Sequence, residues 1–147
     1  MIAVIGAGSC DEKISQIAEQ VGELLAKKNY TIICGGLGGV MEAACKGAKK
    51  AGGQTVGILP GNDPKEANPY IDIAIATGMG VGRNIIIIRS CTAVLAINGS
   101  FGTLSELAYA MQLNKPVVGL KTWDISENIF KSSDVEEAVN KISELAG

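Results

Sequence analysis

Short apolar runs alternate along the chain with segments whose apolar residues recur at helical spacing. Apolar runs bounded by turn residues predict strands at residues 2–5, 30–34, 54–59, 71–76, 93–97 and 116–120. Helical spacing of apolar residues predicts helices within 14–25, 40–51, 104–111 and 135–145. Because the two kinds of segment alternate, we expect an α/β fold, a single Rossmann-like three-layer α/β/α domain over residues 1–147 with a mostly parallel sheet.

Two local patterns refine this prediction. Ile85–Ile88 has strand propensity throughout, but only four residues separate it from the strand at 93–97, too few for a parallel crossover. We therefore predict a helix over residues 82–90, buried against the sheet. Before the helix at 14–25, Ser9 and Glu12 have the S-x-x-E spacing of a capping box.

Composition narrows the classes of protein and of partner. The 147 residues are 47% hydrophobic with a formal net charge of −2, which excludes global disorder and leaves no surplus of positive charge for nucleic acid or a membrane surface. No window approaches the roughly 18 apolar residues of a membrane span, and the N-terminus lacks the features of a signal peptide. We expect a cytoplasmic protein whose partner is a small ligand.

The chain has no histidine, which excludes a Ser-His-Asp triad, a Cys-His pair and a His-ligated zinc site. Proton chemistry would have to use Asp, Glu, Lys, Tyr or Cys. Cys10, Cys34, Cys45 and Cys91 form no C-x-x-C pair, so we expect reduced, buried thiols and no metal site.

Three glycine-rich loops follow predicted strands, where the N-termini of the next helices attract anions. Each loop alone is also compatible with an ordinary tight turn, whereas three loops meeting at one edge would form a phosphate site. Asp11 stands where a dinucleotide motif needs its third glycine, and no P-loop motif occurs. The candidate ligand-binding residues in the three loops are Gly8, Ser9, Gly35, Gly36, Asn98, Gly99, Ser100, Gly102 and Thr103.

Two charged residues extend this candidate site. The chain has only two arginines, and Arg83 follows the glycine-rich residues 78–82, where its guanidinium would hold a phosphate or simply end a helix at the surface. Glu106 has capping-box spacing from Thr103, so it would cap a helix, orient a hydroxyl or water beside a bound sugar, or do both.

From Met79 to Glu106 the chain resembles the Lonely Guy (LOG) family, also called lysine decarboxylase-like. The family signature is an R-K step followed by P-G-G-x-G-T-x-x-E. The corresponding residues here are Arg83-Asn84 and Asn98-Gly99-Ser100-Phe101-Gly102-Thr103-Leu104-Ser105-Glu106. Earlier landmarks match in order at residues 8–9, 35–41 and 57–60, so the resemblance covers most of the chain.

The resemblance implies a phosphoribohydrolase that splits the N-glycosidic bond of nucleoside 5′-monophosphates. It makes Arg83 and Glu106 the catalytic pair and Gly99, Gly102 and Thr103 the phosphate loop. Stabilisation of an oxocarbenium-like sugar and delivery of water are within reach of a carboxylate, with no cofactor or metal required. Lysine decarboxylation is disfavoured, because no lysine has the setting of a pyridoxal phosphate site.

Departures from the signature favour an alternative function. Asn98 and Ser100 replace its Pro and second Gly, and Asn84 replaces its Lys. These changes resemble a sister branch that includes molybdenum cofactor carrier proteins, which implies a nucleotide or molybdopterin-type ligand that is bound without reaction. A distant likeness to DNA-processing proteins is a third hypothesis, weakened by the missing basic patch. The resemblance also implies a homodimer or tetramer.

Overall fold

Seven strands form one sheet in a computed structural model that describes residues 1–147. The strands are β1 (Ile2–Gly6), β2 (Ile32–Cys34), β3 (Thr55–Leu59), β4 (Ile73–Ala76), β5 (Ala93–Ile97), β6 (Val117–Leu120) and β7 (Ile129–Ser132). The helices are α1 (Glu12–Lys27), α2 (Val40–Lys50), α3 (Asn84–Ser90), α4 (Phe101–Gln112) and α5 (Val135–Ala146), with 3-10 turns η1 (Pro64–Glu66) and η2 (Gly80–Arg83).

All the strands are parallel and lie in the order β4-β3-β2-β1-β5-β6-β7. The chain moves outward from β1 to β4, returns through α3 to the other side of β1, and moves outward again from β5 to β7. Register places Ile2 beside both Ile32 and Ala93. This doubly wound arrangement confirms the predicted Rossmann-like α/β fold, and the sheet is wholly rather than mostly parallel.

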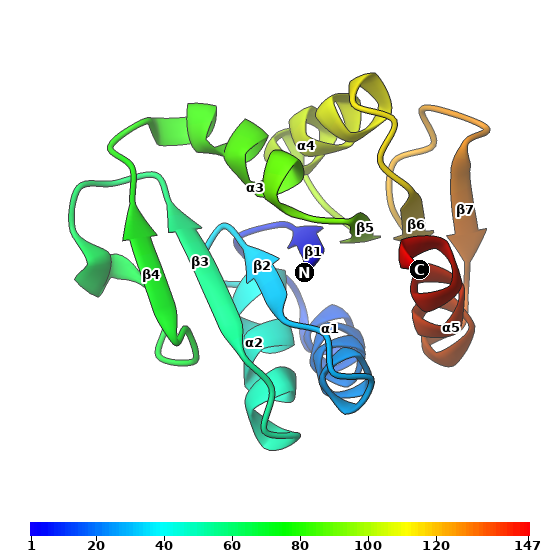
Figure 1. The fold of residues 1–147 in the computed structure, drawn as a ribbon, viewed down its shortest axis with the longest axis horizontal. Coiled ribbons are helices and arrows are strands. Elements are labelled where there is room, and N and C mark those ends of the chain that lie inside the picture. The colour runs from blue at the N-terminus through cyan, green and yellow to red at the C-terminus, as the bar shows by residue number, and fades with distance from the viewer.

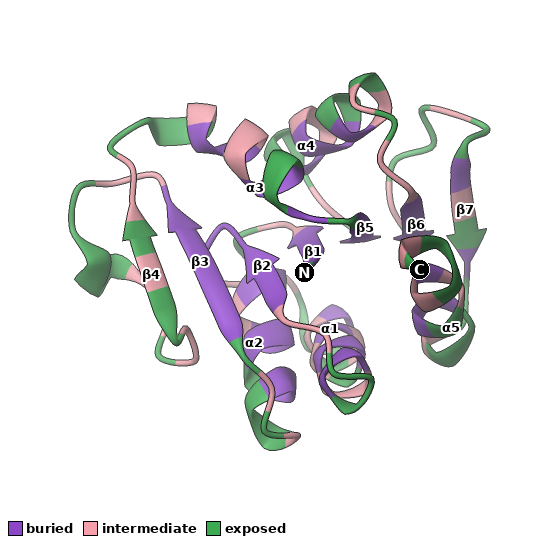
Figure 2. Cartoon of the chain, viewed as in Figure 1, coloured by how far each residue is buried: buried purple, intermediate pink, exposed green.

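Helices cover both faces of the sheet (Figure 1). Successive side chains of a strand point to opposite faces, so Ile2 and Val4 pack with α1, α2 and α5, while Ala3 and Ile5 pack with α3 and α4. The central strands are buried along their length, whereas β4 at the edge is half exposed (Figure 2). The two buried clusters give the three predicted layers.

The helix predicted over residues 82–90 is confirmed, as η2 followed directly by α3. Ile87 and Ile88 are fully buried against the sheet, which explains apolar residues with strand propensity in a helix. No strand was predicted at β7, because this edge strand pairs on one side only and buries only Ile129 and Ser132. Its apolar pattern is therefore too short to detect.

The capping box predicted from Ser9 and Glu12 is wrong. Asp11 caps α1 instead: its backbone is extended, and its carboxylate accepts a hydrogen bond of 2.9 Å from the Ile14 N–H. Helix α1 begins at Glu12, so Ser9 lies in the preceding loop, outside the helix. No helix combines the length and apolar character needed to cross a membrane.

Glycines bring α1 and α2 into close contact. A Cβ added to Gly22 would lie 1.9 Å from the Ala44 carbonyl oxygen, and one added to Gly47 would lie 1.8 Å from that of Glu19. The small residues of α2 therefore allow close packing on α1. This contact fixes α1 and α2 as one unit beneath the loops that follow β1 and β2.

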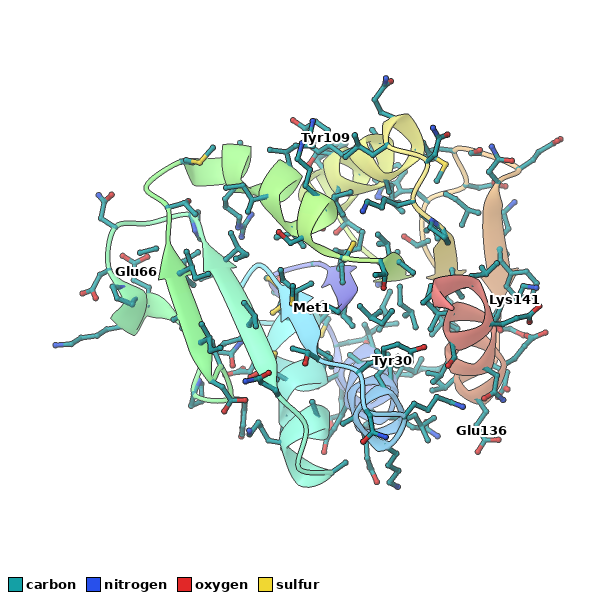
Figure 3. The ribbon with its side chains drawn as sticks, viewed as in Figure 1. Met1, Tyr30, Glu66, Tyr109, Glu136 and Lys141 are labelled. Carbon is teal, nitrogen blue, oxygen red and sulfur yellow. The ribbon has the colours of Figure 1, made fainter.

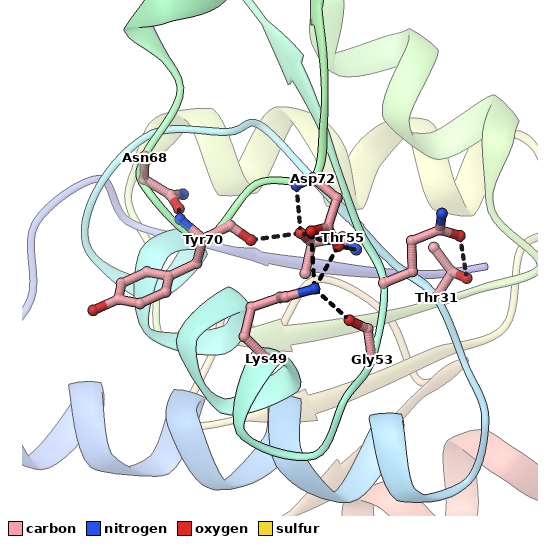
Figure 4. Close-up of polar contacts among 8 residues, drawn as sticks. Thr31, Lys49, Gly53, Thr55, Asn68, Tyr70 and Asp72 are labelled. Carbon is pink, nitrogen blue, oxygen red and sulfur yellow. Dashed lines mark hydrogen bonds and ion pairs between the residues drawn. The ribbon is translucent and has the colours of Figure 1, made fainter.

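A polar network closes the β3–β4 edge (Figure 4). The Asp72 carboxylate accepts a 2.9 Å hydrogen bond from the Thr55 N–H and lies 2.8 Å from Lys49 Nζ, which also donates to the Gly53 carbonyl. The Thr55 hydroxyl donates to the Tyr70 carbonyl at 2.6 Å. These contacts hold the long segment between β3 and β4 against α2.

The last helix is tied to the end of the first. Figure 3 shows Tyr30 between α1 and α5, and its hydroxyl lies 3.2 Å from the Ser143 hydroxyl. One such hydrogen bond contributes about 1 kcal/mol to the stability of the fold. It fixes the C-terminal helix on the α1 side of the sheet.

All the cysteines are free thiols. The sulfurs of Cys34, at the end of β2, and Cys45, in α2, lie 3.7 Å apart. Cys34, Cys45 and Cys91 are buried as predicted, whereas Cys10 is half-buried. The buried thiols act as small apolar side chains in the core.

Candidate functional site

The structure brings the three glycine-rich loops together at one edge of the sheet. The loop with Gly8 follows β1, the loop with Gly35 follows β2, and the loop with Asn98 follows β5. Because β1 lies between β2 and β5, their carboxyl ends are neighbours at the point where the strand order reverses. The Val40 N–H also donates to the Ala7 carbonyl at 3.0 Å, which joins the first two loops directly.

Two residues with left-handed backbone shape the loop after β5. Asn98 has φ of 50° and Gly99 has φ of 121°. A Cβ on Gly99 would lie 2.5 Å from Thr103 Cγ2, so only glycine allows this turn to approach the first turn of α4. Ser100 precedes α4 without capping it by a side-chain hydrogen bond. The first N–H groups of α4 are therefore available to an anion.

Thr103 supplies a buried hydroxyl in this first turn. The residue is 2% exposed, and its Oγ1 has no hydrogen-bond partner. A buried hydroxyl without a partner costs free energy, and this one lies beside the Gly99 turn.

The capping box predicted from Thr103 and Glu106 is wrong. Helix α4 begins at Phe101, three residues earlier than that pattern requires, so Thr103 is inside the helix. The Ser105 hydroxyl instead donates to the Gly102 carbonyl at 2.6 Å. Glu106 is therefore free of a capping role and faces the interior.

Arg83 is buried, which excludes the surface position considered as an alternative. It is 8% exposed, and its Nε donates to the Ile58 carbonyl at 2.8 Å while Nη2 donates to the Gly35 carbonyl at 3.4 Å. Nη1 donates to the Asn84 side chain. Burial lowers the pKa of Arg83, and the charge of Glu106 opposes this change. The guanidinium thus joins the ends of β2 and β3.

Gly35 makes room for this guanidinium, and Gly36 makes room for Leu59 of β3. A Cβ on Gly35 would lie 2.6 Å from Arg83 Nη2, and a Cβ on Gly36, where φ is 79°, would lie 2.6 Å from Leu59 Cδ2. Both glycines are buried, whereas Gly8, Ser9, Asn98, Ser100 and Gly102 are half-buried or exposed. The candidate residues therefore form an open set at β1 and β5 and a buried set at β2.

Glu106, in α4, is buried like Gly35 and Gly36. It is 7% exposed, and its carboxyl makes no hydrogen bond or ion pair. Burial raises the pKa of Glu106 to about 7, while the charge of Arg83 lowers it. The structure brings Arg83 and Glu106 together, and near neutral pH the carboxyl is divided between its protonated and ionised forms.

Asn84 is a part of the site that the sequence did not reveal. Its side chain accepts from Arg83 and donates to the Ser105 hydroxyl at 3.0 Å, so it links η2 to α4. The sequence signal was its position beside Arg83, where the Lonely Guy signature has lysine. No group of three or more acidic or cysteine side chains is arranged to hold a metal ion.

Two cavities lie beside the open loops. One, of about 470 Å³, lies between the starts of α1 and α2 and is lined by Gly8, Ser9 and Lys46 among others. The other, of about 200 Å³, lies between Asn98–Gly99 and the residues after β6. Arg83 and Glu106 line neither cavity.

A family model and a related sequence both match almost the whole chain. A family model described as the SLOG cluster4 family matches residues 1–146. An uncharacterized protein of Archaeoglobus fulgidus is 49% identical over 139 residues, which cover 95% of this chain and 91% of that protein.

Solved structures of two molybdenum cofactor proteins have the same fold. The molybdenum cofactor binding protein of Rippkaea orientalis has a TM-score of 0.93 and 35% identity, with coverage of 99% of this chain and 96% of that chain. The molybdenum cofactor carrier protein of Chlamydomonas reinhardtii has a TM-score of 0.87 and 32% identity, with coverage of 98% and 96%.

DNA processing protein A of Helicobacter pylori is similar in fold alone, with a TM-score of 0.73 and 16% identity over 97% of this chain and 80% of that chain. The whole-chain matches at higher identity confirm the predicted resemblance and its sister branch. The chain belongs to the SLOG cluster4 family.

Proposed function

We propose that this protein binds a phosphorylated pterin of the molybdenum cofactor type and carries it without breaking a bond in it. The proposal takes its ligand class from the two molybdenum cofactor proteins that match the whole chain at 32% and 35% identity. The cofactor is cargo here, and the chain supplies the surface that holds it.

One observation carries the proposal: the open loops and the buried acid–base pair are separate. Binding a phosphate needs the accessible N–H groups beside Ser100 and Gly102, and these residues are exposed. Hydrolysis would need the Glu106 carboxyl to reach a sugar or a water molecule, and it is 93% buried and lines neither cavity. The arrangement favours binding over turnover.

In this proposal Asn98, Gly99, Ser100, Gly102 and Thr103 hold the phosphate. The left-handed turn at Asn98 and Gly99 lets the backbone approach the anion, and the helix dipole of α4 favours its charge. The unpartnered Thr103 hydroxyl supports the same placement.

Gly8 and Ser9 adjoin the phosphate loop, because β1 pairs with β5 as far as Gly6 and Ile97. We expect these two residues to contact the ligand beyond its phosphate. Gly35 and Gly36 act indirectly: Gly35 makes room for Arg83, and Gly36 makes room for Leu59.

The test is to purify the full chain from cells that synthesise molybdenum cofactor and to measure bound molybdenum and the fluorescence of the oxidised pterin. Wild type is expected to retain both in constant ratio. Thr103→Val, which keeps the shape of the side chain and removes its hydroxyl, is expected to retain less. Glu144→Gln, an exposed change near the end of α5, is the control. Absence of both signals from wild type would overturn the proposal.

A second candidate function is hydrolysis of nucleoside 5′-monophosphates to free base and ribose 5-phosphate. It is favoured by Glu106, whose pKa of about 7 is suited to proton transfer, and by the neighbouring Arg83 charge. Wild type, Arg83→Ala and Glu106→Gln would be incubated with the monophosphates and the matching nucleosides. Release of base from the phosphorylated forms alone, lost in both folded variants, would establish this function.

We also propose that copies of the chain associate. Ile73 and Ile75 on β4 and Val81 in η2 are large apolar residues that are exposed at one edge of the molecule. Sedimentation of Ile75→Lys and wild type at several concentrations tests this, since a lower mass for the variant is expected.

A further inference from the structure

Two aromatic rings stand at the start of α4, outside both buried clusters. The rings of Phe101 and Trp123 are stacked, with centroids 6.1 Å apart and planes inclined by 26°. Phe101 is 80% exposed and Trp123 is 36% exposed. Only 4% of the residues are aromatic, so a stacked pair placed in solvent is an unusual use of them in this chain.

The pair is held in place by the loops around it. Trp123 Nε1 donates to the Ser100 carbonyl at 3.0 Å, and the Thr122 hydroxyl donates to the Asn98 carbonyl at 2.6 Å. These bonds join the segment after β6 to the proposed phosphate loop. The rings are therefore fixed beside the first turn of α4. Phe101 stacks on Trp123 and is otherwise open to solvent.

A positive charge accompanies the rings. Lys121 has a left-handed backbone, with φ of 52°, and its side chain makes no hydrogen bond or ion pair. With Trp123 it lines the 200 Å³ cavity beside Gly99 and a second cavity of about 420 Å³ that extends to β7. Lys131 at the far end is paired with Asp124. Lys121 is thus an unpaired cation that shares a cavity with Trp123 and Gly99.

Two independent features therefore point to a ligand at this place. The buried Thr103 hydroxyl without a partner lies beside Gly99, where an anion would sit. The exposed aromatic pair lies beside Ser100, where a flat ring would stack: Phe101 follows Ser100 in sequence and Trp123 donates to its carbonyl. A phosphate and an aromatic ring of one molecule account for both.

We propose that Phe101 and Trp123 form a stacking platform for the heteroaromatic ring of a phosphorylated ligand, whose phosphate is bound by Gly99–Thr103 and Lys121. For a pterin ligand this inference builds on the proposed function. Stacking requires only a flat ring, so the platform accepts purine nucleotides as well. It gives the chain a ring-binding subsite separate from Arg83 and Glu106.

The experiment uses the full chain and two probes, guanosine 5′-monophosphate with a ring and ribose 5-phosphate without one. Trp123 is the only tryptophan, so its fluorescence reports on the platform alone. Guanosine 5′-monophosphate is expected to quench it. By calorimetry, Phe101→Ala is expected to weaken binding of the nucleotide by about 5- to 150-fold. The affinity of ribose 5-phosphate is expected to stay within about twofold, because that probe does not stack.

Three further variants separate the parts of the site. Lys121→Met is expected to weaken both probes, since the lysine contacts the phosphate. Phe101→Tyr is expected to restore nucleotide binding, because a phenol ring stacks as well. Tyr109→Ala is the matched control, because Tyr109 is another aromatic residue of α4 and lies on its outer side, two turns from the platform (Figure 3).

The outcomes distinguish this inference from the proposed function. Equal retention of molybdenum cofactor and equal nucleotide affinity in wild type and Phe101→Ala would overturn the platform and leave the carrier proposal standing. Loss of nucleotide binding in Phe101→Ala, with no cofactor retained by wild type, would support the platform and overturn the carrier. The platform is wrong if wild type binds neither the nucleotide nor the cofactor. It is also wrong if Phe101→Ala changes the molecular mass of the assembly in solution and leaves the affinity for the nucleotide unchanged.

Discussion

Replacing Glu106 by Gln is expected to stabilise the protein above neutral pH and to have a much smaller effect in mild acid. The side chain is 7% exposed, and burial raises its pKa from the ordinary 4.5 to about 7 against the opposing charge of Arg83. Gln has the shape of the protonated carboxyl and cannot ionise. The variant therefore removes the cost of a buried charge while it keeps the packing.

The sign follows from the raised pKa. The folded chain holds this proton more tightly than the unfolded chain, so the free energy of unfolding of wild type falls as the pH rises from about 4.5 to about 7. At about 1.4 kcal/mol per pKa unit, the total loss is about 3 kcal/mol. The advantage of Glu106→Gln is expected to grow by about 2 to 3 kcal/mol between pH 5 and pH 8.

Urea unfolding at pH 5, 6, 7 and 8, followed by circular dichroism, measures this advantage directly. Glu127→Gln is the matched control, because the same chemical change is made on an exposed side chain, and its effect on the unfolding free energy is expected to be small throughout. A difference between Glu106→Gln and wild type that stays constant from pH 5 to pH 8 would refute the argument from burial.

Substitutions at three positions test the packing and the helix cap described above, each by urea unfolding. Gly22→Ala is expected to lower the free energy of unfolding by about 3 kcal/mol or more, since its Cβ would lie 1.9 Å from the Ala44 carbonyl oxygen, which belongs to the backbone. Gly102→Ala is expected to raise it by about 0.5–1 kcal/mol, because nothing lies near its Cβ and alanine favours the helix; a loss would contradict the open surface at α4. Asp11→Ala is expected to cost about 1 kcal/mol through loss of the hydrogen bond from the Ile14 N–H, whereas Asp11→Asn should cost much less.

The fold was largely predictable, because its signals are local and repeated. Apolar runs and helical stripes located six of the seven strands and four of the five helices, and the four-residue gap before Ala93 identified the fifth helix, at Ile85–Ile88. Caps were not predictable, since Ser9 and Asp11 both have capping side chains and the backbone decides which one caps. β7 was missed because an edge strand needs little apolar sequence.

The site was predictable in its parts but not in its layout. The pattern of strands and glycine-rich loops predicted Arg83, Glu106 and the glycines at one edge of the sheet, where the structure places them. Burial separates them: Arg83 donates to the carbonyls of Gly35 and Ile58, a contact between strands that spacing along the chain does not encode. The stacked rings of Phe101 and Trp123 were missed for the same reason, since 22 positions separate them in sequence.

The strand order also constrains the timing of folding during synthesis. β1 is made first, yet one of its two partners, β5, begins about 90 residues later. About 60 residues lie between the end of β2 and the start of β5, so at roughly 5–20 residues per second translation leaves β1 with β2 as its only partner for about 3 to 12 s. Because β1 is wholly apolar apart from its terminal glycine, one flank of it stays open to other chains and to chaperones throughout that interval. The switch in strand order that brings the ligand loops together is thus also the point at which the nascent chain is most exposed to misassembly.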